Sequence, residues 1–215
     1  AVRNIGVNPI IYRLNPLLNF EAGIELVKAY TYLNRGSEVV SLTRELIEEA
    51  SDDENDLSSG KKPSENQVAW LCLNLVRFLT SCSVQPDGSY IIPDYCSKDE
   101  LYGYLEKAVA IYDKLSKHGL SLQDRNDYAE LMFSKGSLDK ADGKIESAEE
   151  ALKKANRLYS ELRSLTDDKG CELELCSVLM NLVELAESSG DEDRTVFLLD
   201  EMLSTLGNGV SLPEQ

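Results

Sequence analysis

The side chains that could carry out chemistry are few in this chain, and they do not form a familiar catalytic set. The single histidine, His118, stands beside Gly119 at a predicted helix end, where a cation interacts favourably with the helix dipole. One terminal histidine does not assemble a Ser–His–acid triad, and no glycine-rich phosphate loop occurs. Carboxylates are abundant, but no spacing selects one pair for acid–base chemistry. We therefore expect no catalytic residues and no enzymatic activity.

Metal ligands are also poorly placed in the sequence. Cys171 and Cys176 are five residues apart, so they do not face each other on a helix. The acidic run at 52–56 lacks the glycine and the terminal glutamate of a calcium-binding loop. We expect neither a metal site nor a cofactor.

The cysteines indicate a reducing compartment. There are five, an odd number, and no Cys-x-x-Cys pair occurs. Cys72, Cys82 and Cys176 lie within apolar helical patterns, where thiols behave as small hydrophobic groups. Residues 1–20 contain prolines and polar residues where a signal peptide would be apolar, and the most apolar run, 68–79, is too short to span a bilayer. We expect cytoplasmic or nuclear localisation and no membrane association.

The charge balance is strongly acidic, with 38 Asp and Glu against 22 Lys and Arg and a formal net charge of -16. Direct nucleic-acid binding needs a basic stripe, which this sequence lacks, and an anionic membrane would repel the chain. Two interpretations remain open. The charge serves solubility, or it attracts a basic client such as a histone, a ribosomal protein or a nuclear import signal.

Eight segments carry apolar residues at every third or fourth position, as amphipathic helices do. Gly36 is expected to end the first helix, and Ser37 to cap the second. The helix at 169–188 is apolar on most sides, so we expect neighbours to cover it on both sides. The predicted helices are at about 17–34, 37–50, 65–82, 98–118, 122–140, 144–165, 169–188 and 192–206.

Two capping boxes and four irregular segments interrupt this pattern. The boxes pair Ser64 with Gln67, and Ser97 with Glu100. The acidic, serine-rich segment at 51–63 is predicted to be a mobile loop. We expect an extended segment at 1–16, one helical domain over 17–206 with a long connection at 83–97, and a tail at 207–215.

Two stretches share one spacing of small and apolar residues. Each predicts a helix, a tight turn at the second glycine, and a second helix whose small residue packs against the first. A helical hairpin that cannot cover its own apolar face must stack on similar hairpins, and such stacks form binding surfaces. The stretches are Gly136-x6-Gly143-x4-Ala148-x3-Leu152-x2-Ala155 and Val183-x6-Gly190-x4-Thr195-x3-Leu199-x2-Met202.

These hairpins resemble tetratricopeptide repeats. Residues 129–159 match the family pattern best, 179–203 match it more loosely, and 104–115 look like the second helix of a unit. Three features depart from the pattern: Asp139 stands where an aromatic is usual, no proline closes the units, and the intervals between units are irregular. An ordinary helical bundle with accidental spacing is the alternative. The residues at the family's packing positions are Met132, Gly136, Gly143, Ala148, Leu152 and Ala155.

The resemblance implies an all-α, right-handed superhelix of antiparallel helix pairs, with about eight helices and a concave groove lined by the first helix of each pair. Some family members clamp a chaperone C-terminal carboxylate between lysines and asparagines. Only Asn181 matches that clamp here, and no clamp lysine is present, so we expect no such ligand. The groove positions implied for this chain are Tyr30, Asn34, Phe133, Ser137, Lys140, Met180, Glu184 and Glu187.

Together these features favour a non-enzymatic interaction protein. The first hypothesis is an adaptor or dedicated chaperone whose acidic helical surface holds a basic segment of a partner protein. The second is a structural subunit of a larger complex, docking through apolar helix faces.

Overall fold

The structure is a computed structural model that describes residues 16–51, 63–81, 92–166 and 170–207. Within these ranges all regular secondary structure is α-helical, which confirms the predicted all-α class there. Eight helices are present in these ranges, and each begins and ends within two residues of its predicted position. They are α2 (Pro16–Tyr32), α3 (Gly36–Ser51), α4 (Glu65–Ser81), α5 (Lys98–Ser116), α6 (Leu122–Ala141), α7 (Ile145–Leu165), α8 (Gly170–Ser189) and α9 (Glu192–Gly207).

Most of the predicted irregular segments lie outside the described residues. This holds for nearly all of the extended segment at 1–16, the acidic loop at 51–63 and the tail at 207–215. The connection at 83–97 is described only from Ile92 onwards. There the Cys96 amide donates a 3.0 Å hydrogen bond to the Pro93 carbonyl, which forms a turn just before α5.

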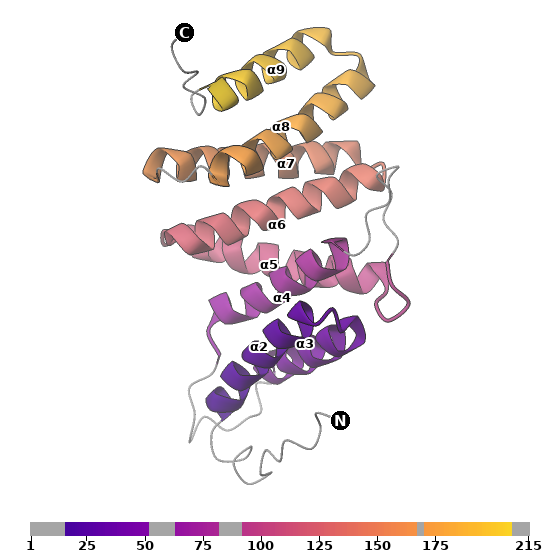
Figure 1. Cartoon of the computed structure of the whole chain (residues 1–215), viewed down its shortest axis with the longest axis vertical. Helices are drawn as coiled ribbons and strands as arrows, with labels where there is room; N and C mark the ends of the chain where they lie inside the picture. The colour runs from indigo at the N-terminus through magenta and orange to yellow at the C-terminus, as the bar shows by residue number, and fades with distance from the viewer. Residues whose placement is uncertain (1–15, 52–62, 82–91, 167–169, 208–215) are drawn as a thin grey trace, which may run out of the picture. The chain divides into compact units, whose positions relative to one another are not determined.

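The helices form two compact units. The first contains α2, α3, α4 and residues 98–111 of α5, and the second contains residues 112–116 of α5 together with α6, α7, α8 and α9. In the first unit α2 packs on α3, and α3 packs on α4 (Figure 1). The helix α4 is buried on most of its surface, as its apolar sequence predicts, and Leu71, Leu73 and Leu75 are fully enclosed.

Three helices end in the same way, in a Schellman turn. In each turn one amide bonds to a carbonyl five residues back, and the residue before it adopts positive φ. The positive-φ residues are Asn34 at 53°, Gly143 at 72° and Gly190 at 72°. The tight turns predicted at the two glycines are therefore confirmed. The prediction that Gly36 ends the first helix is wrong, because Asn34 tolerates the left-handed conformation and ends it instead.

Gly36 has a different role, which the sequence did not indicate. It is the first residue of α3, so Ser37 lies inside the helix and does not cap it. A Cβ at Gly36 would lie 2.1 Å from the hydroxyl oxygen of Tyr95 and 3.2 Å from the Phe78 ring. Gly36 is therefore needed for close packing inside the first unit.

The two predicted capping boxes are present. The Ser64 amide donates to the Gln67 side-chain oxygen at 2.9 Å, and the Gln67 amide donates to the Ser64 hydroxyl at 3.3 Å. At α5 the Glu100 amide donates to the Ser97 hydroxyl at 3.1 Å. These bonds satisfy amides that the first turn of a helix leaves without intrahelical partners.

In the second unit α6, α7, α8 and α9 follow one another as packed neighbours (Figure 1). The closest approach is at Gly136 of α6, where a Cβ would lie 2.5 Å from Leu152 Cγ and 3.2 Å from the Ala148 carbonyl oxygen. The predicted packing of the small residue Ala148 against the first helix is thus confirmed. The helix α8 packs against both α7 and α9, so its apolar sides are covered as expected.

We expect Gly136→Ala to destabilise the protein by about 1 to 3 kcal/mol, because the added methyl overpacks the α6–α7 contact by more than the gain in helix propensity offsets. Urea unfolding followed by circular dichroism measures the change. The matched control is Gly103→Ala in α5, where a Cβ would meet nothing within 4 Å. That change should leave stability equal or raise it by up to about 1 kcal/mol. Equal effects of the two substitutions would contradict the close approach at Gly136.

Candidate protein-interaction surface

The predicted groove positions of the second unit lie on α6 and α8, and one pair of them is in direct contact. The Lys140 ammonium of α6 forms an ion pair with Glu184 of α8 and donates a 2.5 Å hydrogen bond to the Asn181 side-chain oxygen. The only amide that matches the carboxylate clamp is therefore engaged by a cation of this chain. That cation is itself neutralised by Glu184, so this arrangement does not favour an incoming carboxylate.

The remaining groove positions of α6 and α8 are at least partly accessible. Phe133 and Ser137 are half-buried on α6, whereas Met180 and Glu187 are exposed on α8. These side chains offer apolar and acidic contacts to a partner, and their role in binding stays a prediction.

Tyr30 and Asn34 belong to the first unit. The Arg35 guanidinium lies 5.0 Å from the centre of the Tyr30 ring and pairs with Glu38, so this ring already stacks on a cation of its own chain. Asn34 ends α2 through its positive φ. One groove through all eight positions stays a prediction, because these two lie in one unit and the other six in the other.

A buried carboxylate that sequence analysis did not interpret holds the α6–α7 hairpin together. Asp139 is 1% exposed, pairs with Lys135 and accepts a 2.7 Å hydrogen bond from the Ser147 hydroxyl of α7. The Lys144 ammonium approaches it to 3.7 Å. This is the position where the tetratricopeptide pattern has an aromatic. The signal in the sequence was an aspartate with lysines four residues before and five residues after it.

A second polar cluster joins the end of α5 to α6 and α7. The Tyr128 hydroxyl and the Lys154 ammonium both donate to Asp113, at 2.5 and 2.7 Å, and the Tyr112 ring stacks on Tyr128 with centres 5.3 Å apart. Partial burial alone would raise the pKa of Asp113, but the bonds from Lys154 and Tyr128 outweigh it and hold that pKa below its usual value. Burial, followed by the bond to Asp113, raises the pKa of Tyr128. Asp113 is therefore ionised and Tyr128 uncharged at neutral pH, and both side chains serve packing.

The first unit has an analogous bond between α3 and α5. The Arg44 guanidinium donates to Glu100 at 2.6 and 3.0 Å, and the Tyr104 hydroxyl donates to the same carboxylate at 3.1 Å. Burial acts to raise the pKa of Glu100, yet the bonds from Arg44 and Tyr104 lower it overall. The same cluster raises the pKa of Tyr104 to about 12, chiefly through burial.

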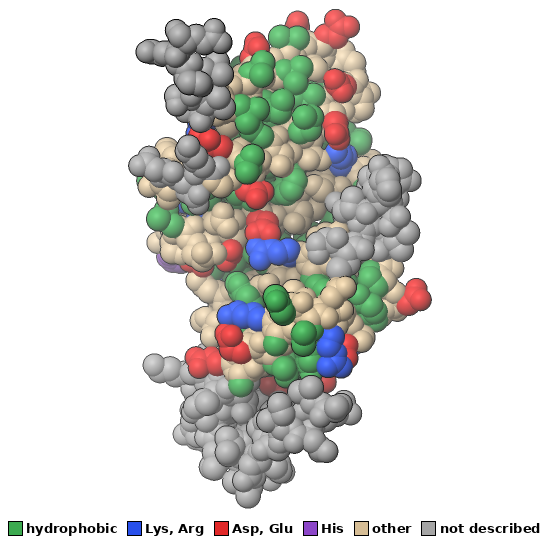
Figure 2. Space-filling model, viewed as in Figure 1, with side chains coloured by type: hydrophobic (Ala, Val, Ile, Leu, Met, Phe, Trp, Pro, Cys, Tyr) green, Lys and Arg blue, Asp and Glu red, His purple; other side chains and the backbone are tan. Residues whose placement is uncertain are grey.

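The helices α8 and α9 form the most acidic part of the second unit. With the turn between them, residues 170–207, they contain nine carboxylates and one cation, Arg194, which lies 3.0 Å from Glu149 of α7. Figure 2 shows hydrophobic side chains gathered on the surface over these helices, with acidic side chains beside them. The exposed large apolar residues here are Leu173, Met180, Val196, Phe197, Leu203 and Leu206.

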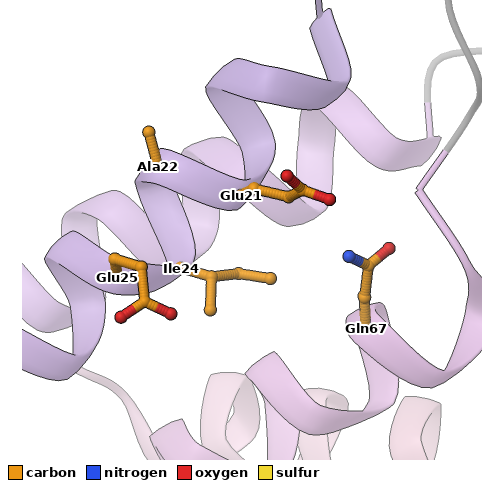
Figure 3. A pocket seen from close by; sticks show the side chains of 5 residues that line it. All are labelled: Glu21, Ala22, Ile24, Glu25 and Gln67. Carbon is orange, nitrogen blue, oxygen red and sulfur yellow. The ribbon is translucent and has the colours of Figure 1, made fainter.

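The first unit contains an open pocket of about 480 Å³ between α2 and α4. Figure 3 shows Glu21 and Ile24 of α2 and Gln67 of α4 directed toward the same space. Glu25, also at the pocket, forms a 2.7 Å ion pair with Lys28. The lining offers carboxylates and an amide over an apolar base, which suits a cation better than an anion.

The thiols and the histidine are poorly placed for reaction chemistry. Burial raises the pKa of Cys72 to about 12 and that of Cys96 to about 11, so both thiols stay protonated at neutral pH. Cys176 is half-buried, Cys82 lies outside the described residues, and His118 is exposed in the turn after α5. Among the described residues no cluster of three or more His, Cys, Asp or Glu side chains could hold a metal ion. No described helix is both long and apolar enough to cross a membrane.

No protein-family model matches this sequence, and no curated protein matches it either.

We expect Asp139→Asn to destabilise the protein by about 2 to 3 kcal/mol, because it leaves the half-buried Lys135 without its carboxylate. The free energy of unfolding in urea measures this loss. Glu150→Gln, an exposed position on α7, makes the same change in net charge and should alter stability by less than about 0.5 kcal/mol. A similar loss in both variants would mean that net charge, and not the Asp139 cluster, is responsible.

Arg44→Gln should lower stability at neutral pH by about 1 kcal/mol, a modest value because Arg44 is 43% exposed. The folded-state pKa of Glu100 is depressed, so its stabilising contribution is present above the unfolded-state pKa and is lost as pH falls through the folded value. Thermal melts from pH 7 down to about pH 3 should therefore show the wild-type advantage shrinking below about pH 4.5. An advantage that stays constant over this range would contradict the proposed Arg44–Glu100 coupling.

Proposed function

We propose that this chain is a non-enzymatic interaction protein, an adaptor or dedicated chaperone that binds a basic segment of a partner protein through its acidic helical surface. The observation that carries this proposal is the charge of residues 170–207, which form α8, α9 and the turn between them, where nine carboxylates stand against one arginine that is already paired with Glu149. Such a surface attracts cationic segments and orients them before contact. Suitable clients are histones, ribosomal proteins or similar basic proteins of the cytoplasm or nucleus. Nucleic acids and membranes are not expected partners.

The proposed architecture is a tetratricopeptide-like, right-handed superhelix. Side-chain bonds in the second unit support it because they join each helix to the next helix but one. Lys140 links α6 to α8, Arg194 links α9 to α7, and Lys154 links α7 to the end of α5. Stacked helical hairpins make such contacts, since first helices then lie beside first helices and second beside second.

The second candidate function is a structural subunit that docks through apolar helix faces. It is favoured by the exposed apolar residues of α9, where Phe197 is 66% and Leu203 is 62% exposed.

A labelled, unstructured peptide rich in lysine and arginine should bind the chain, and its affinity should fall about tenfold or more between about 0.05 and about 0.5 M salt, because exposed charges are screened. Fluorescence anisotropy measures the binding. Glu187→Gln on α8 should weaken it, whereas Glu150→Gln on α7 removes the same charge elsewhere and should change it less. Affinity independent of salt, or equal losses in the two variants, would count against an acidic site on α8 and α9.

A further inference from the structure

The outer face of α9 is apolar although no described element covers it. Residues Val196, Leu199, Leu203 and Leu206 follow one another at intervals of three or four, so they share one face of the helix. Val196 is 58%, Leu203 62% and Leu206 40% exposed. The opposite face holds the buried residues of this helix, Leu198 and Thr205, and packs toward the rest of the second unit.

This face is unusual for a helix that the described helices cover on one side only. Helices with one uncovered side in stacked repeats are polar outside, because an uncovered apolar face would otherwise remain in water. The neighbouring helix α8 provides a comparison: it packs against both α7 and α9, and eight of its residues are buried. The stripe on α9 therefore has the composition of a helix that receives another helix against it.

An acidic stripe runs beside the apolar one. Asp193, Phe197, Asp200 and Ser204 also follow at intervals of four and three, and all four are exposed. The single cation of α9, Arg194, is turned toward Glu149 of α7 and does not neutralise this stripe. A helix docked on the apolar residues would bring its flanking side chains close to Asp193 and Asp200. Those flanking side chains must be cationic for the contact to be favourable.

Charge also distinguishes between the segments that could bind this face of α9. A second copy would place the same carboxylates against these, and the whole chain carries a net charge of -16. The segment 208–215 contains Glu214 and no lysine or arginine. We therefore propose that the outer face of α9 binds an amphipathic helix of a partner protein, with an apolar face and lysine or arginine along one flank. This inference rests on the proposed function and specifies the form of the basic segment.

The test uses a labelled 20-residue peptide of leucine, alanine and lysine, with leucines at helical spacing and lysines along one flank. A permuted peptide of the same composition, whose leucines do not share a face, is the first control. We expect the amphipathic peptide to bind the full chain at least about tenfold more tightly than the permuted one. Leu203→Ser should weaken its binding about tenfold, and Asp200→Asn should weaken it a few-fold and reduce its salt dependence. Leu173→Ser, at a position 67% exposed on α8, should have no effect.

Several results would overturn the proposal. Equal affinity for both peptides would show unspecific charge attraction, and an unchanged affinity in Leu203→Ser would place the site elsewhere. A dimer in analytical ultracentrifugation that Leu203→Ser dissociates would identify a second copy as the occupant. Tighter peptide binding after replacing Arg3 and Arg13 with alanine would identify the chain's own residues 1–15. If the unstructured basic peptide binds and Leu203→Ser changes nothing, only this inference fails. If neither peptide binds, the proposed function fails with it.

Discussion

Coverage of apolar helix faces by neighbouring helices is the constraint on which the second unit depends. Helices in proteins gain most of their stability from tertiary packing of an apolar face, so the apolar side of each helix must be buried by its neighbours. Where both neighbours exist, as for α8, most apolar residues are buried, including Leu179 and Leu182. Where the described residues supply a neighbour on one side only, as for α9, Leu203 and Leu206 are exposed. The same rule that builds the core thus leaves an apolar surface on the last described helix.

Polar side chains fix how these helices meet. The close approach at Gly136 lets α6 and α7 pack tightly, but apolar contact alone does not set their register. Asp139, bonded to Lys135 and Ser147, ties one end of this hairpin, and Asp113 ties α5 to α6 and α7 through Tyr128 and Lys154. A carboxylate buried to 1% exposure is stable only with such partners. These bonds therefore help to fix the register of helices whose other contacts are apolar.

Acidic surface and apolar stripe have complementary roles in the proposed interaction. Carboxylates such as Asp193 and Asp200 act over about a Debye length and favour cationic partners during approach. The apolar residues act only on contact, and their burial would supply most of the affinity. A partner with cationic side chains but no apolar face would be attracted without docking. A partner with an apolar face but no cationic side chains would dock without being selected by charge.

Much of the fold could be predicted because helix period, turn glycines and capping boxes are local signals. The eight helices, the turns at Gly143 and Gly190 and the Ser64–Gln67 box follow from residues close together in the sequence. The end of α2 was predicted at the wrong residue, since asparagine and glycine both tolerate positive φ and only the surrounding packing, with Tyr95 against Gly36, distinguishes them.

The candidate surface could be predicted less fully from the sequence than the helices. Helical period identifies which residues of α9 share a face, but it does not say whether another helix covers that face. In the same way, aspartate is usually a solvated residue, and only the positions of Lys135 and Ser147 make the burial of Asp139 favourable. The sequence by itself determined the helices, their turns and the acidic charge, because these depend on residue type and short spacing. The tertiary structure alone decided which faces are buried, because burial depends on contacts between residues far apart in the chain.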